Sequence, residues 1–105
     1  MNRVLLVGRI TKIHDFIVAE EEENRECIEI TIAVPRYYKN KMGNYGFDFI
    51  KVLVKTKEIL SATLEYCKMG DIIGVDGCVC KLDTDNEMYV LANKISFLAM
   101  SKESD

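Results

Sequence analysis

A strict two-residue alternation between Cys27 and Val34 constrains the fold of this chain more than any other feature. Large aliphatic side chains occupy every second position, at Ile28, Ile30, Ile32 and Val34. Because successive side chains of a β-strand point to opposite faces, this period of two is the signature of a strand with one buried face. We expect the strand to end at Pro35, since proline cannot donate a hydrogen bond to a neighbouring strand. The chain is therefore expected to build its core from a β-sheet.

Four further stretches read as strands. They cover Val4 to Val18, Phe47 to Lys55, Asp71 to Leu82 and Met88 to Leu98. The first is expected to bend or bulge near Gly8, because a glycine inside a strand often marks a sharp bend. The glutamate run that follows it, together with Asn24 and Arg25, is typical of a solvated turn. The last two strands are expected to be joined by the polar residues 83–86, which form a hairpin turn.

A single helix is expected between the third and fourth strands. Thr56 is suited to cap it, its apolar side runs from Ile59 to Cys67, and Gly70 can adopt the left-handed conformation that ends a helix. Three strands, one helix and two strands are the element order of an all-β, five-stranded OB-fold Greek-key barrel. An SH3-like barrel usually lacks this helix and a sandwich needs more strands, although periodicity alone leaves both open. We expect residues 1–99 to form one OB-fold domain, followed by a short polar end at 100–105.

The charge of the chain is unevenly distributed. The formal net charge is −3, which by itself argues against a nucleic-acid partner. The segment from Arg36 to Lys57, however, carries six basic side chains and only one acidic side chain, Asp48. A local basic region can attract phosphate while the protein as a whole remains acidic.

The same region combines basic residues with aromatic ones. Residues 36–46 read as an extended hairpin or long loop, and their basic and aromatic members are Arg36, Tyr37, Tyr38, Lys39, Lys41 and Tyr45. The outer row of the next strand is expected to hold Phe49, Lys51, Leu53 and Lys55, and the apolar Leu53 favours a contact between subunits. Bases stack on aromatic rings and cations pair with phosphates, so the pattern favours binding of a single nucleic-acid strand with little sequence preference. The pattern alone leaves open an inert sheet, because aromatic residues and lysine are common on exposed strands.

The sequence offers little for enzymatic chemistry. His14 is the only histidine and lies at no motif spacing from a cysteine or serine nucleophile, so an acid–base pair or a triad lacks its second member. No glycine-rich phosphate loop, zinc spacing or calcium loop occurs, and the four cysteines are expected to be reduced thiols. We therefore predict no enzyme, no metal and no cofactor. No signal peptide and no membrane span is evident, which favours a cytoplasmic location.

Several blocks of residues resemble one known family. The opening MNRVLLVGRITK, from Met1 to Lys12, is similar to the first strand of bacterial single-stranded DNA-binding proteins. Further matching blocks follow in the family's order and spacing, at Ile30 to Val34, Arg36, Lys39, Asn40, Asp48 to Ile50, Tyr66, Lys68, Gly70, Asp71 and Gly74 to Gly77. By this resemblance, the chain is identified as a member of the family from Met1 to about Leu98.

The resemblance implies an OB-fold subunit that forms a dimer or tetramer and holds single-stranded DNA during replication, recombination or repair. Tyr38 and Phe49 match the family's stacking positions, and Lys55 falls where relatives often carry another aromatic residue. The family's first strand implies that Asn2 and Arg3 lie at a subunit interface or near the path of the DNA. The candidate nucleic-acid-binding residues are thus Arg3, Arg36, Tyr37, Tyr38, Lys39, Lys41, Phe49, Lys51 and Lys55.

Three departures from the family pattern limit what the resemblance carries over. The segment between the first two strands is acidic and lacks the family's usual block with its glycine turn. The turn at 83–86 is short, whereas in relatives a longer arm often grips DNA. The sequence ends at 101–105 without a flexible, acidic-tipped tail, so replication partners recruited through such a tail are not expected. Two alternatives stay open, a primosome-type accessory protein and an OB-fold protein-assembly module that has lost DNA binding.

Overall fold

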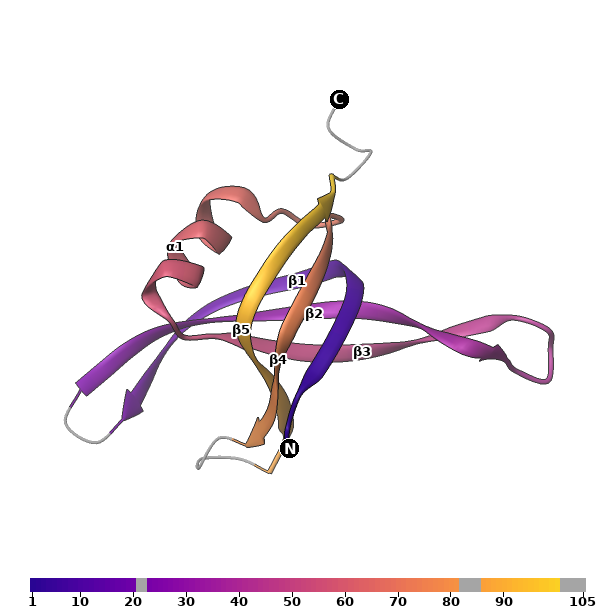
Figure 1. Cartoon of the computed structure of the whole chain (residues 1–105), viewed down its shortest axis with the longest axis horizontal. Coiled ribbons are helices and arrows are strands. Elements are labelled where there is room, and N and C mark those ends of the chain that lie inside the picture. Colours follow the sequence, from indigo (N-terminus) through magenta and orange to yellow (C-terminus); the bar gives the residue numbers. More distant parts are fainter. Residues whose placement is uncertain (21–22, 82–85, 101–105) are drawn as a thin grey trace.

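The computed structural model describes residues 1–20, 23–81 and 86–100, and it confirms a five-stranded barrel with one helix between the third and fourth strands. The elements are β1 (Val4–Glu20), β2 (Glu23–Lys39), β3 (Tyr45–Val54), α1 (Lys57–Tyr66), β4 (Ile72–Lys81) and β5 (Met88–Ala99). The sheet closes in the order β1-β2-β3-β5-β4, with β3 and β5 parallel and the other neighbours antiparallel (Figure 1). Within the described residues, no helix is long and apolar enough to cross a membrane.

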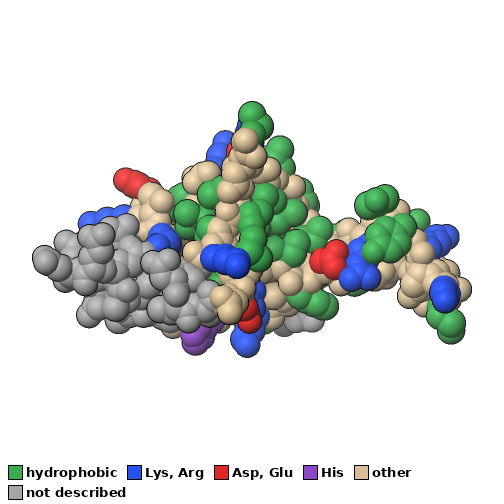
Figure 2. All heavy atoms as spheres, turned by 90° about the horizontal axis from the view of Figure 1, so that it is seen from below, with side chains coloured by type: hydrophobic (Ala, Val, Ile, Leu, Met, Phe, Trp, Pro, Cys, Tyr) green, Lys and Arg blue, Asp and Glu red, His purple; other side chains and the backbone are tan. Residues whose placement is uncertain are grey.

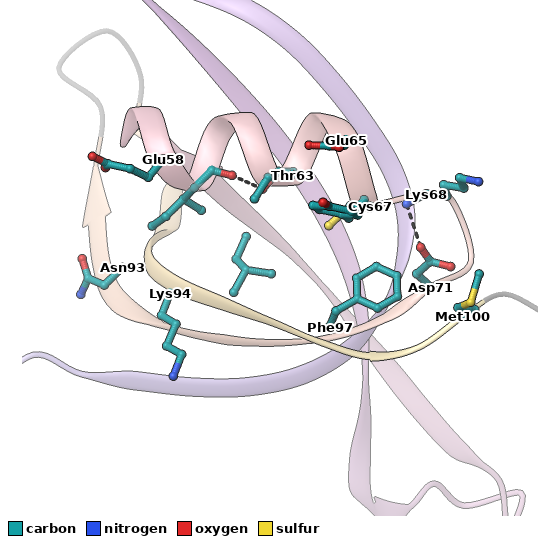
Figure 3. Close-up of a pocket in the computed structure, with 14 residues that line it drawn as sticks. Glu58, Thr63, Glu65, Cys67, Lys68, Asp71, Asn93, Lys94, Phe97 and Met100 are labelled. Atoms are coloured by element: carbon teal, nitrogen blue, oxygen red, sulfur yellow. Dashed lines mark hydrogen bonds between the residues drawn. The ribbon is translucent and has the colours of Figure 1, made fainter.

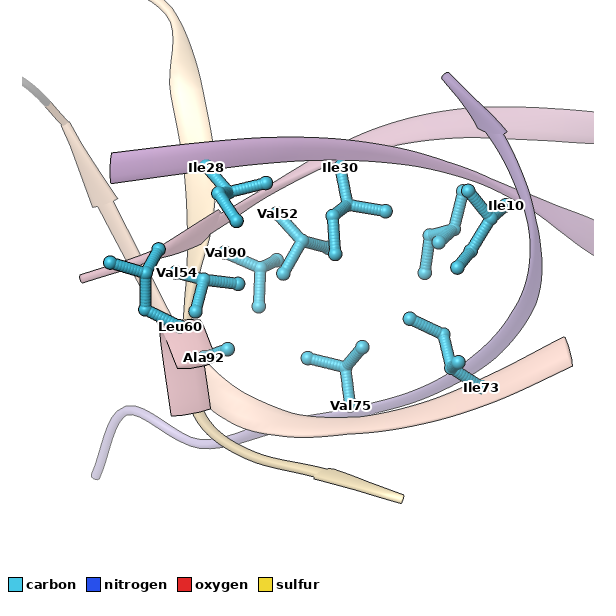
Figure 4. Packing of buried hydrophobic residues seen from close by; sticks show 11 residues of the cluster. Ile10, Ile28, Ile30, Val52, Val54, Leu60, Ile73, Val75, Val90 and Ala92 are labelled. Carbon is cyan, nitrogen blue, oxygen red and sulfur yellow. The ribbon is translucent and has the colours of Figure 1, made fainter. Parts of the chain in front are cut away.

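The alternation of β2 builds the core, as predicted. Ile28, Ile30 and Ile32 are fully buried, and they pack inside the barrel against side chains from every other strand and from α1 (Figure 4). The core cluster consists of Ile10, Ile28, Ile30, Ile32, Val52, Val54, Leu60, Ile73, Val75, Val90 and Ala92. Full burial of one such side chain is worth about 1.5–3 kcal/mol. The inward row of β3 is therefore firmly held, and this fixes which of its side chains face outward.

β1 pairs with two different strands along its length, and its hydrogen-bonded ladder is irregular close to the residue where the partner changes. The first part of the strand pairs with β4 and the rest pairs with β2. The irregularity lies between Ile10 and Lys12, so the predicted bend or bulge is found a few residues after Gly8, which itself lies in the regular ladder with β4. The hydroxyl of Thr11 donates a hydrogen bond to the Thr31 carbonyl at 3.1 Å. The extra residue of the bulge thereby keeps a partner on the facing strand.

β2 and β3 continue beyond the barrel as a two-stranded hairpin. The prediction that Pro35 ends the second strand is wrong, because β2 runs on to Lys39 and Pro35 lies opposite Phe47. A register shift between Pro35 and Lys39 accommodates the proline, which has no N–H to donate. The segment 36–46, hereafter the arm, is thus an extended hairpin that projects from the barrel (Figure 1). At its turn, the side-chain oxygen of Asn40 accepts two backbone hydrogen bonds, at 2.9 and 3.0 Å.

α1 is shorter than the sequence implied. It ends at Tyr66, with Cys67 as an extended C-cap, so the prediction that Gly70 ends the helix is wrong. Gly70 has a φ of 89° in the turn before β4, and its N–H donates to the Ile10 carbonyl at 2.8 Å. Thr56 occupies the N-cap position without a side-chain capping hydrogen bond. The turn after the helix is therefore tied to β1, which anchors this end of α1 to the barrel.

β4 and β5 approach each other closely at Gly77. A Cβ atom at this position would overlap the carbonyl oxygen of Leu91, so only glycine fits this point of the ladder. The register of the two strands shifts between Asp76 and Gly77. The close approach brings the start of β5 beside β4 at the end of the barrel that carries the candidate site.

The ladder between β1 and β2 extends further than predicted. The ladder continues to the pair Glu20 and Glu23, so Asn24 and Arg25 belong to β2 rather than to a turn. Residues 21–22 of the predicted acidic turn lie outside the described residues. The same holds for residues 82–85, which include most of the second predicted turn.

Candidate nucleic-acid interface

The outer side of β3 carries an exposed row of aromatic and basic side chains. Alternation places Tyr45, Phe47, Phe49 and Lys51 on the same side of the strand. Phe47 is 53% exposed and Phe49 is 67% exposed. The residues opposite these two rings on β2 are Pro35 and Ala33, which are too small to cover them. Phe47, Phe49 and Lys51, hereafter the β3 face, therefore offer two open rings beside a cation.

A groove of about 410 Å³ runs beside the β3 face. It lies between β3 and the neighbouring ends of β4 and β5, and it is lined by Phe49, Ile50, Lys51, Val79, Glu87, Met88, Tyr89 and Val90. The parallel pairing of Val52 with Val90 brings β5 to this position. The Nζ atom of Lys51 lies 5.9 Å from the centroid of the Tyr89 ring, which is within the range of a cation–π attraction. Tyr89 thus holds the Lys51 ammonium group over its ring, and Tyr89 itself is buried, with 6% exposed.

The arm, which extends β2 and β3 beyond the barrel, carries further rings and cations. The rings of Tyr37 and Tyr38 meet edge to face, with their centroids 5.3 Å apart, and they are 93% and 53% exposed. The Nζ atom of Lys39 lies 5.6 Å from the centroid of the Tyr45 ring, and Lys41 is exposed at the turn. Figure 2 shows hydrophobic and basic side chains intermingled on the projecting arm, at the right of the view. The arm therefore continues the combination of rings and cations found on the β3 face.

Arg36 of the arm and Lys51 of the β3 face are each paired with a carboxylate. Arg36 donates to the Asp48 carboxylate from Nε at 3.1 Å and from Nη2 at 2.8 Å. These hydrogen bonds lower the pKa of the Asp48 carboxyl. Lys51 donates to the Glu87 carboxylate, and this hydrogen bond raises the pKa of Lys51. All four side chains are exposed to solvent to a substantial degree, so each pair contributes little to stability and can exchange partners.

Arg3 lies away from the β3 face, and Lys55 lies just beyond the last residue of β3. Arg3 forms a salt bridge with Asp76 at 3.0 Å across the β1–β4 pair, and β2 and β5 separate these strands from β3 in the barrel. The structure therefore does not bring Arg3 together with the other candidate residues. Lys55 follows β3 directly and is half-buried. Its charge acts on the thiol of Cys80 in β4, where burial raises the thiol pKa and Lys55 acts in the opposite direction.

Some of this surface was missed or misplaced by sequence reasoning. Phe47 could have been found, because it lies two residues before Phe49 and therefore on the same side of the strand. Glu87 and Tyr89 gave no comparable signal, since β5 reaches β3 only through closure of the barrel. The prediction of a subunit contact at Leu53 is wrong, because its side chain is 1% exposed where β5 pairs with β3.

A second cavity, of about 660 Å³, lies between α1 and the second half of β5 (Figure 3). The Thr63 hydroxyl donates to the Ile59 carbonyl at 2.7 Å, and the Asp71 carboxylate accepts from the Lys68 N–H at 2.8 Å. Burial raises the pKa of the neighbouring Cys67 thiol. Among the described residues, no group of three or more His, Cys, Asp or Glu side chains is placed to hold a metal ion, and none of the four cysteines forms a disulfide. This cavity therefore presents no chemistry comparable to the row of rings and cations on β3.

Both the sequence and the fold have known relatives. The model of the Single-strand binding protein family matches residues 1–94. Single-stranded DNA-binding protein 1 of Clostridium acetobutylicum is 36% identical over 113 aligned positions, covering 99% of this chain and 99% of the relative. A Plasmodium falciparum SSB solved in complex with ssDNA has a TM-score of 0.73 at 14% identity, covering 93% of this chain and 95% of that one. The dimeric N-terminal domain of PriB from Thermoanaerobacter tencongensis has a TM-score of 0.68 at 17% identity, covering 94% and 98%. At these identities, the two structures establish the shared fold.

Proposed function

Since the chain belongs to the single-strand binding protein family, we propose that it binds single-stranded DNA with little sequence preference, in DNA replication, recombination or repair. The observation that carries this proposal is the β3 face, where Phe47 and Phe49 lie exposed beside Lys51 and a groove. The proposed activity is binding alone and includes no catalytic step. The cytoplasmic location stays a prediction.

The β3 face supports binding through stacking and charge together. Phe47 and Phe49 lie on one side of a strand, about 7 Å apart along it, so bases of one DNA strand can stack on successive rings. Stacking of this kind is worth about 1–3 kcal/mol per base. Lys51 and the cations of the arm can pair with the phosphates that link those bases. Because every base has a π-face, the arrangement tolerates any sequence.

The test is an anisotropy titration of a fluorescently labelled oligo-dT, with duplex DNA and RNA of equal length as competitors. We expect binding that weakens with salt, with a slope of about −0.7 per neutralised phosphate. Duplex DNA should compete poorly, because its bases are stacked on one another and not available to the rings. Absence of binding at low salt would contradict the proposal and favour the protein-assembly alternative.

We further propose that the chain assembles as a dimer or tetramer through the first part of β1. Leu5, Val7 and Leu98 are 67%, 54% and 54% exposed. Val7 pairs with Gly74, and a Cβ at Gly74 would lie 3.6 Å from a methyl carbon of Leu98, so these apolar groups share one outer side of the barrel. In the described chain, β2 pairs with β1 only from Arg9 onward, so the stretch before it is paired along one edge. An exposed apolar strand with an open edge is a template for a second copy.

Sedimentation velocity tests this assembly. Leu5→Asp places a charge in the apolar surface and should shift the protein toward smaller species. Leu64→Asp is the matched control, since Leu64 is 55% exposed on α1, outside this surface. Unchanged sedimentation of Leu5→Asp, or an equal shift with Leu64→Asp, would contradict the proposed interface.

A further inference from the structure

Two carboxylates pair with cations that we propose contact phosphates. Glu87 is bonded to Lys51 in the groove, and Asp48 is bonded to Arg36, the first residue of the arm. A carboxylate and a phosphate both accept charge-assisted hydrogen bonds from lysine and arginine. The two anions therefore compete for the same donors.

We infer that Glu87 competes with the DNA backbone for Lys51: it pairs with this lysine in the free protein and opposes the pairing of a phosphate with it. The inference rests on the proposed function. Asp48 acts on Arg36 in the same way, at the entrance to the arm. Each cation thus exchanges one anionic partner for another when a strand binds, instead of gaining a partner where it had none.

The closure of the barrel brings Glu87 into contact with Lys51. Glu87 immediately precedes β5, which lies parallel to β3, and its side chain meets Lys51 beside the groove. The side chains of Lys51 and Glu87 are 39% and 55% exposed, so an incoming phosphate can reach the pair. Exposed ion pairs of this kind are weak, which allows the exchange to take place.

This exchange of partners changes how much electrostatic contacts and stacking each contribute to binding. A phosphate that displaces Glu87 gains one contact at Lys51, but the contact with Glu87 is lost and the released carboxylate repels the phosphate. A ring such as that of Phe49 has no such competitor, since it stands 67% exposed. The carboxylates therefore reduce the electrostatic share of binding and leave stacking as the larger share.

Anisotropy titrations with labelled oligo-dT at about 50 mM and about 300 mM salt test the inference. Glu87→Gln keeps the size of the side chain and removes its charge. We expect it to bind about two- to fivefold more tightly than the wild type at the lower salt, the change that loss of one exposed ion pair allows. The advantage should shrink at the higher salt, because exposed charges are screened. Glu65→Gln controls for net charge, since Glu65 is exposed on α1 and lines the other cavity, and it should bind like the wild type.

A double-mutant comparison isolates the pair. In a Lys51→Gln background, the Glu87→Gln substitution should give a smaller gain in affinity than in the wild type, because the cation for which Glu87 competes is gone and only the repulsion between carboxylate and phosphate is removed. Binding by the wild type with no gain from Glu87→Gln, or with an equal gain from Glu65→Gln, overturns the inference and leaves the proposed function standing. Absence of binding by the wild type at the lower salt overturns the proposed function, and the inference with it.

Discussion

Replacing Phe49 by alanine separates base stacking from structural packing, because the ring is largely exposed. With 67% of the residue exposed, roughly a third of a surface of about 200 Å² is covered by the protein, or about 65 Å². At about 25 cal/mol per Å², this burial is worth at most about 1.6 kcal/mol of the free energy of unfolding. If a base stacks on the ring, the substitution also removes about 1–3 kcal/mol of binding free energy. The dissociation constant for oligo-dT should then rise about 5- to 150-fold.

Anisotropy titrations measure this loss of affinity, and urea unfolding measures the accompanying loss of stability. Tyr66→Ala is the matched control, since Tyr66 is an aromatic residue of α1 that is 61% exposed and should leave binding unchanged. Phe49→Trp should keep or improve binding, because it supplies a larger ring. A folded Phe49→Ala protein that binds as tightly as the wild type would refute the stacking argument. An equal loss of affinity in Tyr66→Ala would refute the assignment of the stacking site to β3.

Three further predictions concern charge, packing and pH. Lys51→Gln should reduce the magnitude of the salt slope by about 0.7, the contribution of one phosphate, in titrations over a series of salt concentrations. Gly77→Ala should lower the free energy of unfolding by about 1–3 kcal/mol in urea titrations, because its methyl group would overlap the Leu91 carbonyl. The hydrogen bonds from Arg3 lower the pKa of Asp76 below its ordinary value of 3.8, so this carboxylate stabilises the fold above that pH and the contribution is lost as the pH falls through the lowered pKa. Asp76→Asn should therefore be less stable than the wild type at about pH 7, and urea unfolding should show a smaller difference at about pH 2–3.

The features that could be predicted from the sequence are the strand faces and the element order, which depend on residues close together in the chain. Alternation placed Phe49 and Lys51 on the outer side of a strand, and the order of the elements indicated the barrel. The contact between Lys51 and Glu87 joins residues 36 positions apart, and it exists only because β3 and β5 pair when the barrel closes. Leu53 is buried, although alternation alone assigns it to the surface. Proline chemistry predicts a strand end at Pro35, but the register shift in the β2–β3 hairpin lets the strand continue where the missing N–H is tolerated.

Ultraviolet cross-linking of the wild-type protein to bromouracil-substituted oligo-dT, followed by mass spectrometry of the peptides, tests the central claim most directly. A ring that stacks on a base is positioned to form the cross-link. We predict cross-links within β3, at Phe47 and Phe49, the two exposed rings of the β3 face. Cross-links confined to α1 or to the second half of β5 would contradict the account, because those elements line the other cavity.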